Sequence, residues 1–205
     1  SNARPIPIDK FKRGLLLYVN GKKHEVSDAQ PTTTLLEWLR ANGLTGTKLG
    51  CSEGGCGACT VMISKRDLGS GEIRHFAANA CLMPLCAADW CAVTTVEGIG
   101  SNKPNSKLHP VQERMTALHG SQCGFCTPGI VMSIYSLLRQ SPGLTMAEMQ
   151  EHLEGNRCRC TGCRPTADAS RSLCSDAPGG GGGGGCASNG CGHRGGWPLR
   201  RGRLL

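Results

Sequence analysis

The cysteines of this chain constrain its fold more than any other feature. The sequence holds 14 of them in 205 residues, and eight fall into two sets with distinct spacings. So many cysteines usually form disulfides in small secreted domains or ligate metal. The chain starts with Ser1-Asn2-Ala3 and shows no apolar signal region, which favours a reducing, cytoplasmic compartment. Metal or cluster ligation is then the expected use of the thiols.

The first set consists of Cys51, Cys56, Cys59 and Cys81. Four and then two residues separate the first three, which is the plant-type spacing for a 2Fe–2S cluster. Gly54, Gly55 and Gly57 stand where the chain has to bend around the cluster, and glycine permits the positive φ of such bends. Four cysteines also suit tetrahedral zinc, or remain as buried free thiols, although zinc sites usually have paired short spacings.

The second set combines a C-x-x-C with a C-x-C and consists of Cys123, Cys126, Cys158 and Cys160. The C-x-x-C leads into an expected helix near Pro128, and the C-x-C lies in the loop before another helix. Two loops at the same end of a group of helices can converge on one metal centre. A redox dithiol at a helix N-terminus and a zinc site remain as alternatives. The C-x-C argues against the dithiol, which needs no second pair.

Hydrophobic patterning predicts a compact α+β unit over residues 14–99. Thr34 can cap a helix through Arg40, with leucines on one face. Asn20-Gly21 favours a type I′ hairpin turn, because both central residues of that turn need positive φ. Four strands are expected, at 15–19, 22–26, 61–64 and 92–96.

The second half of the chain has a helical pattern. Residues 98–106 are rich in Gly, Pro, Asn and Ser and are expected to form a linker to a helical unit over 107–174. Residues 175–205 contain 12 of the 30 glycines, so we expect a low-complexity, unfolded tail. Four helices are expected, at 110–119, 127–140, 145–153 and 165–174.

The net charge of +8 lies mostly at the ends of the chain. Residues 1–13 and 175–205 each contribute +3, which leaves +2 for the middle. A solvated tail explains this balance better than a nucleic-acid-binding face. No stretch approaches the roughly 20 apolar residues that a membrane helix needs. We therefore expect neither nucleic acid nor membrane as a partner.

Several motifs closely resemble the N-terminal iron–sulfur region of the xanthine dehydrogenase and aldehyde oxidase family, the molybdenum hydroxylases. The match covers residues 14–174 and is most similar to the eukaryotic xanthine dehydrogenase type. The motifs are GCSEGGCGACTV at 50–61, TVEGI at 95–99, HPVQER at 109–114, GSQCGFCTPGI at 120–130 and NRCRCTG at 156–162.

The resemblance implies a ferredoxin-like β-grasp domain followed by an all-α four-helix domain, each with one 2Fe–2S cluster. Electrons then pass from a molybdopterin centre through both clusters to FAD. Gln122 and Cys160 match family positions that approach the pterin, and the cluster of the second set is the one nearer the molybdenum. Molybdopterin and FAD are expected on other domains or partner subunits, in an enzyme that is a homodimer and acts in purine catabolism.

The resemblance also has limits. Position 163 is Cys where the family usually has Tyr, and the match stops after Cys174. The chain is then an oxidoreductase subunit, a fragment or a truncated product, with no catalytic residues for hydroxylation. A non-enzymatic zinc or thiol module and a free-standing ferredoxin remain as alternatives.

Six cysteines lie outside the two sets. Cys86 and Cys91 flank strand-like sequence and are expected in the core as small apolar residues. Cys163, three residues beyond Cys160, can compete in cluster assembly. The others are Cys174, Cys186 and Cys191.

Overall fold

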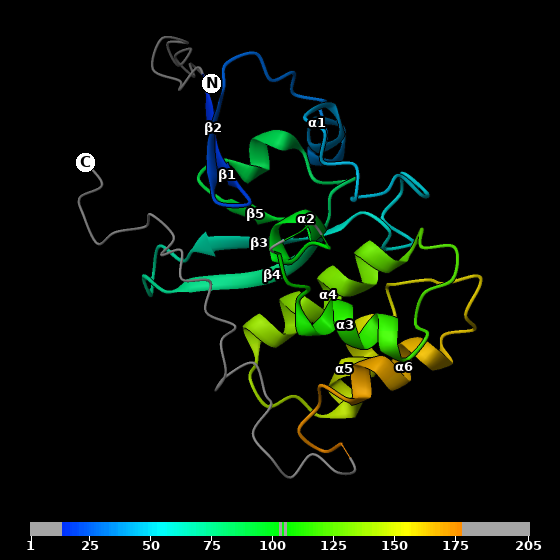
Figure 1. Cartoon of the computed structure of the whole chain (residues 1–205). Coiled ribbons are helices and arrows are strands. Elements are labelled where there is room, and N and C mark those ends of the chain that lie inside the picture. The colour runs from blue at the N-terminus through cyan, green and yellow to red at the C-terminus, as the bar shows by residue number, and fades with distance from the viewer. Residues whose placement is uncertain (1–13, 103, 105, 178–205) are drawn as a thin grey trace, which may run out of the picture.

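A mixed α/β architecture with one five-stranded sheet and six α-helices is seen in the computed structural model, which describes residues 14–102, 104 and 106–177 (Figure 1). The tail expected over 175–205 lies outside the described residues apart from its first three. The strands are β1 (Leu15–Val19), β2 (Lys22–Val26), β3 (Thr60–Arg66), β4 (Ile73–Asn79) and β5 (Ala92–Thr94). The helices are α1 (Leu35–Ala41), α2 (Val96–Ile99), α3 (Pro110–Ala117), α4 (Thr127–Gln140), α5 (Met146–Leu153) and α6 (Arg164–Arg171), with a 3-10 turn at Leu85–Ala88.

The sheet has the strand order β2-β1-β5-β3-β4. β1 and β2 form the expected antiparallel hairpin, and Asn20 and Gly21 take φ of 49° and 82° in its turn. β5 runs parallel to β1 and antiparallel to β3, which ties the late strand into the middle of the sheet. β4, a strand that the sequence did not predict, pairs with β3 along its whole length.

One face of the sheet is covered by α1. Thr34 and Glu37 form a capping box at its N-terminus, as the Thr34 cap predicted. Leu35, Leu36 and Leu39 of α1 are buried against the sheet. Full burial of a leucine side chain stabilises a fold by about 1.5–3 kcal/mol, so these leucines hold α1 on this face of the sheet. Cys59 and Cys81 belong to the same core.

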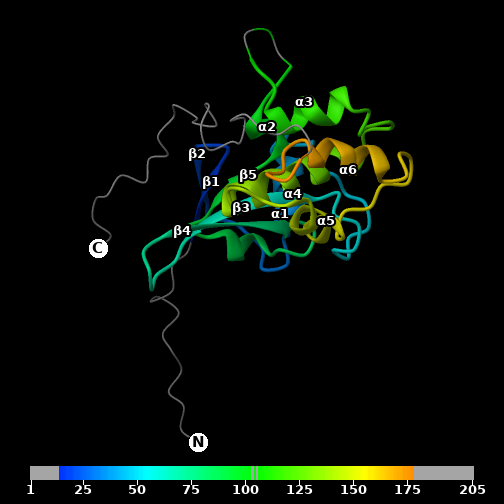
Figure 2. The same cartoon turned by 90° about the horizontal axis from the view of Figure 1, so that it is seen from below.

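The opposite face is covered by α4, which contacts both β3 and β4. Successive side chains of β3 alternate between the faces: Val61 and Ile63 lie in the α1 core, and Met62 lies in the α4 core. Figure 2 shows α4 against the sheet with the other late helices beside it. The α+β unit and the helices therefore share a strand rather than touching only through a linker.

The helices after residue 107 have well-formed starts. His109 caps α3 in a capping box with Gln112, and Thr145 caps α5 in another with Glu148. α3 packs on α4 and α6, and α5 packs on α4 and α6. In the described part of the chain, no helix has the length and apolar character needed to cross a membrane.

The end of the predicted strand at 92–96 and the start of the linker at 98–106 differ from expectation. β5 stops at Thr94, and α2 forms a single helical turn whose Ile99 is buried in the α4 core. The cause is a long-range contact, because the Asn20 side chain accepts from Thr95 N (2.9 Å) and donates to Thr95 Oγ1 (2.9 Å). These bonds turn the chain after Thr94.

Candidate metal centres

The loop at 49–59 bends tightly around the sulfur of Cys51. The backbone N–H groups of Glu53 and Gly55 donate to Cys51 Sγ, at 3.5 and 3.3 Å. Gly54 and Gly57 take the positive φ that the sequence predicted, but Gly55 does not. Ser52 adopts the left-handed conformation instead, with φ of 61°. Several N–H groups thus point at one sulfur, which stabilises negative charge there.

The four cysteines of the first set lie together as two interacting pairs. Cys51 contacts Cys56, and Cys59 contacts Cys81. The N–H of Glu53 is the main cause that lowers the pKa of Cys51 to about 7. Burial raises the pKa of Cys59 to about 12, and the neighbouring Cys81 thiol adds to the rise. A positively charged metal would favour the thiolate form of both.

Glycine backbone lies directly against this set. A Cβ on Gly50 would sit only 2.7 Å from Cys56 Sγ, so the sulfur rests on bare backbone. A Cβ on Gly54 would meet Leu82 at 2.7 Å. Gly50 thus leaves room for the Cys56 sulfur, and Gly54 also takes a φ of 71° that favours glycine.

The second set is also gathered as two interacting pairs. Cys123 contacts Cys160, and Cys126 contacts Cys158. Cys126 is the N-cap of α4, so the C-x-x-C stands at a helix start as the sequence predicted. Thr161 N donates to Cys158 Sγ at 3.3 Å, and the Thr161 hydroxyl lies 2.9 Å from the same sulfur.

The pKa values within this set diverge. Burial opposes ionisation of Cys158, but hydrogen bonds from Thr161, Cys160 and Cys126 together outweigh it and lower the pKa to about 7. Burial, followed by the contact with Cys158, raises the pKa of Cys126 to about 12. The N–H of Phe125 lowers the pKa of Cys123, whereas the contact with Cys123 raises that of Cys160.

The arrangement of these thiols fits two 2Fe–2S clusters. All twelve cysteines in the described residues are free thiols. Within residues 14–102, 104 and 106–177, no three His, Cys, Asp or Glu side chains are arranged to hold a single metal ion. A 2Fe–2S cluster instead requires two thiolates per iron, with sulfides bridging the irons. Two pairs in each set supply that number of ligands.

The two sets are joined by hydrogen bonds between their loops. Residues 156–157, next to Cys158, donate to three consecutive carbonyls of the 49–59 loop. Arg157 Nε donates to Gly55 O (3.3 Å), Arg157 N to Cys56 O (3.0 Å), and Asn156 Nδ2 to Gly57 O (3.1 Å). Asn156 and Arg157 belong to the NRCRCTG motif at 156–162, but no local pattern reveals partners so distant in the chain.

Close packing reinforces this junction. A Cβ on Gly129 of α4 would collide with the Gly57 carbonyl oxygen, so the helix start lies directly on the 49–59 loop. Phe125, within the C-x-x-C, lies 3.6 Å from the Cβ position of Gly50. Both cysteine loops are therefore in contact rather than on separate bodies.

Gln122 and Cys160, which the resemblance places near a pterin, are both exposed. Gln122 lies in the loop before Cys123, and that loop is closed by a contact between the Ser121 and Thr127 hydroxyls (2.8 Å). The exposed side of the second set is thus open to a neighbouring domain or subunit.

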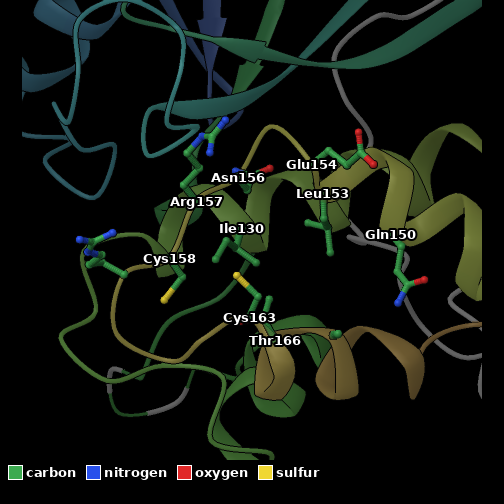
Figure 3. A pocket seen from close by; sticks show the side chains of 11 residues that line it. Ile130, Gln150, Leu153, Glu154, Asn156, Arg157, Cys158, Cys163 and Thr166 are labelled. Carbon is green, nitrogen blue, oxygen red and sulfur yellow. The ribbon is translucent and has the colours of Figure 1, made fainter.

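A cavity of about 650 Å³ lies beside the second set, between α4, α5 and the start of α6 (Figure 3). Ile130 and Leu153 form its apolar wall, and the Cys158 and Cys163 side chains also line it. The Thr166 hydroxyl, another lining group, is buried without a hydrogen-bond partner in the described residues. The cavity contains only one of the eight candidate ligands, so it is not the metal centre itself.

The remaining cysteines divide by burial. Cys91 and Cys174 are buried, and for Cys91 this confirms the expected core position. Cys86 is exposed, so its expected core position is wrong: it lies on the outer side of the 3-10 turn whose Leu85 and Ala88 face the core. Cys163 is exposed, with φ of 66° at the N-cap of α6.

Two family models match the chain. Residues 17–86 match a 2Fe-2S iron-sulfur cluster binding domain, and residues 95–171 match a 2Fe-2S binding domain. These ranges contain the first and second cysteine sets respectively.

Curated relatives cover most of this chain. It is 60% identical over 163 residues to xanthine dehydrogenase/oxidase of Felis catus, covering 79% of this chain and 12% of the relative. It is 55% identical over 161 residues to aldehyde oxidase 1 of Cavia porcellus, covering 78% of this chain and 12% of the relative. The chain thus spans about an eighth of the length of these relatives.

Solved structures show the same likeness. A chain of quinoline 2-oxidoreductase from Pseudomonas putida 86 superposes with a TM-score of 0.64 at 34% identity, covering 77% of this chain and 89% of that one. The aldehyde oxidoreductase of Desulfovibrio desulfuricans gives a TM-score of 0.66 at 33% identity, covering 81% of this chain and 17% of that one.

Proposed function

Since this chain belongs to the xanthine dehydrogenase and aldehyde oxidase family, of which it matches the iron–sulfur region, we propose that it relays single electrons inside a molybdenum hydroxylase. One 2Fe–2S cluster would be held by Cys51, Cys56, Cys59 and Cys81, and the other by Cys123, Cys126, Cys158 and Cys160. Each cluster, when bound, accepts and releases one electron. The fold proposed for the two cluster-binding parts is a β-grasp domain over 14–99 and a four-helix domain over 107–174.

The single observation that carries this proposal is the hydrogen bond from Arg157 N to Cys56 O, at 3.0 Å. Cys56 and Cys158 are ligands of different clusters in this assignment, and Arg157 is bonded covalently to Cys158. A short route of covalent bonds and one hydrogen bond therefore links the two sulfurs. Electron tunnelling weakens less along bonded atoms than across empty space, so the route favours transfer between the clusters.

The residues of this chain also prepare each loop for negative charge. N–H groups directed at Cys51 Sγ and Cys158 Sγ stabilise thiolates, and they stabilise the extra charge of a reduced cluster in the same way. Cys59 is buried, which keeps water away from that side of the first set. The loops are thus organised for reduction without large rearrangement.

The exposed position of Gln122 and Cys160 supports a molybdopterin-binding partner on that side. The 49–59 loop, on the other side of the Arg157 junction, would then give electrons to an FAD-binding partner. Both partners are expected as domains or subunits of the same enzyme, which we propose to be a homodimer in the cytoplasm and no binder of membranes or nucleic acid. The activity proposed for the whole enzyme is hydroxylation of a purine or an aldehyde, and the xanthine dehydrogenase type would act in purine catabolism.

Metal and sulfide analysis of the full chain, purified without oxygen, tests the proposal. We expect about four irons and four acid-labile sulfides per chain, and two distinct EPR signals after reduction with dithionite. Stoichiometric zinc without sulfide would instead identify a zinc module. Transfer of electrons to an unrelated reductase at full rate, in an assay without molybdenum or flavin subunits, would identify a free-standing ferredoxin.

A further inference from the structure

Arg157 reaches across the junction with its side chain as well as with its backbone. Its Nε donates to Gly55 O at 3.3 Å, while its backbone N donates to Cys56 O at 3.0 Å. One residue therefore holds two consecutive carbonyls of the loop that carries the first cysteine set. Figure 3 shows the Arg157 side chain directed away from the side on which the Cys158 sulfur lies. Its charge thus lies against the loop that carries the first set, although Arg157 is adjacent to a ligand of the second.

These bonds affect the groups that face the sulfurs. The C=O and N–H of a trans peptide point in opposite directions, so a carbonyl drawn toward Arg157 turns its N–H away from it. The peptide whose carbonyl accepts from Arg157 Nε carries the N–H of Cys56, and this N–H hydrogen-bonds to Cys51 Sγ on the sulfur side of the loop. Hydrogen bonds linked in this way polarise one another, and a cation at one end strengthens the effect. The guanidinium and the loop dipoles act in the same sense at the first set.

We propose that Arg157 is a positioning residue that raises the reduction potential of the first cluster and has a smaller effect on the second. This inference rests on the proposed function. Reduction adds one electron to a cluster that already has a net negative charge, so a nearby fixed cation stabilises the reduced form. No proton is transferred, and no covalent bond forms or breaks. The electron comes from the reductant used in the titration. Arg157 is exposed, so added salt weakens the effect of its charge.

Arg159 provides a matched control. It lies two residues further along the same loop, it is also exposed, and it has the same charge. Among the described residues, Arg157 and not Arg159 donates to the 49–59 loop. Arg159→Gln therefore removes one positive charge close by without removing the hydrogen bond to Gly55.

The experiment is an EPR-monitored redox titration of the full, cluster-loaded chain in four forms: wild type, Arg157→Gln, Arg157→Lys and Arg159→Gln. The signal of the first cluster is identified as the one that Cys56→Ser removes. We expect Arg157→Gln to lower the midpoint potential of the first cluster, and by more than that of the second. Arg157→Lys, which keeps the charge, should recover most of the shift, and Arg159→Gln should leave the first cluster close to wild type.

Two results would overturn the inference: an unchanged first-cluster potential in Arg157→Gln, or an equal lowering in Arg159→Gln. Iron and sulfide content, measured on every variant, separates a shift of the midpoint potential from a loss of folding or of cluster loading. Failure of the proposed function is distinguishable: a zinc module would bind no iron and show no cluster signals in the wild-type chain, and a free-standing ferredoxin would show both signals but transfer electrons without molybdenum or flavin subunits. A shift in Arg157→Gln that shrinks at high salt would further support a role of the charge.

Discussion

The backbone N–H of Arg157 donates to the carbonyl of Cys56 at 3.0 Å and so joins the two cysteine loops directly. The hydrogen bonds to Gly55 O and Gly57 O join the same two loops beside it. The loop after α5 and the loop before β3 are thus held in one arrangement. Both contact α4, through Asn156 with Ser133 and through Gly57 with Gly129.

The two cysteine sets should act independently. Cys56→Ser should remove one of the two reduced EPR signals and keep the other, because each set supplies its own four ligands. Cys126→Ser should give the complementary result. The measurement is low-temperature EPR of both variants, with iron and sulfide content as the control. Loss of both signals in either variant would show that the sets do not form separate clusters.

Asn156 should stabilise the junction measurably. Its side chain donates to Gly57 O (3.1 Å), and it accepts from the Ser133 hydroxyl (2.6 Å), which is buried in α4. Asn156→Ala should lower the free energy of unfolding by about 1–3 kcal/mol, since the buried hydroxyl is left without that partner. Denaturant unfolding of each variant gives the value.

The double variant Ser133→Ala with Asn156→Ala is the control for this effect. It removes both partners, so its cost should be less than the sum of the two single costs. If the costs simply add, the two side chains are not coupled.

Gly129 should be essential to the contact between α4 and the 49–59 loop. A Cβ at this position collides with the Gly57 carbonyl, which is backbone and cannot swing aside. We expect Gly129→Ala to lower the free energy of unfolding by about 3 kcal/mol or more, at or above the usual upper range for overpacking. Thermal and denaturant unfolding measure the change.

Gly155→Ala is the matched substitution, because a Cβ there has no neighbour within 4 Å. It should be neutral or slightly stabilising, since alanine restricts the unfolded chain. Equal destabilisation by both substitutions would contradict the close approach at Gly129.

His75 should make stability depend on pH. Burial, followed by the charge of Arg139, lowers its pKa below 6.5, and its Nδ1 lies 2.8 Å from the Ser64 hydroxyl. The unfolded chain therefore binds a proton more readily than the folded chain, and stability falls as the pH drops through 6.5. Unfolding of wild type and His75→Gln between about pH 7.5 and 5.5 should show a shallower loss in the variant. Parallel curves would assign the pH dependence to other groups.

Much of the local structure was predictable because its causes are local. The Asn20-Gly21 turn and the Thr34 cap depend on residues a few positions apart, and both have the expected form. β4 was missed because Ile73 and Phe76 are partly exposed at the sheet edge, so its side chains do not form a continuous apolar stripe. The left-handed conformation of Ser52 was not predicted, because positive φ in the 49–59 loop was expected only at glycines.

The sequence alone determined the two cysteine sets and predicted their chemistry, since residue type and spacing are properties of the chain. That these sets bind iron remains a prediction for metal analysis to test. Only the tertiary structure decided how the two loops meet: Arg157 and Asn156 donate to carbonyls about a hundred positions earlier, as the separation of 102 for Arg157 and Gly55 shows. The physical reason is that backbone donors and acceptors are the same in every residue. Which of them pair across the fold depends on the packing of α4 against the sheet.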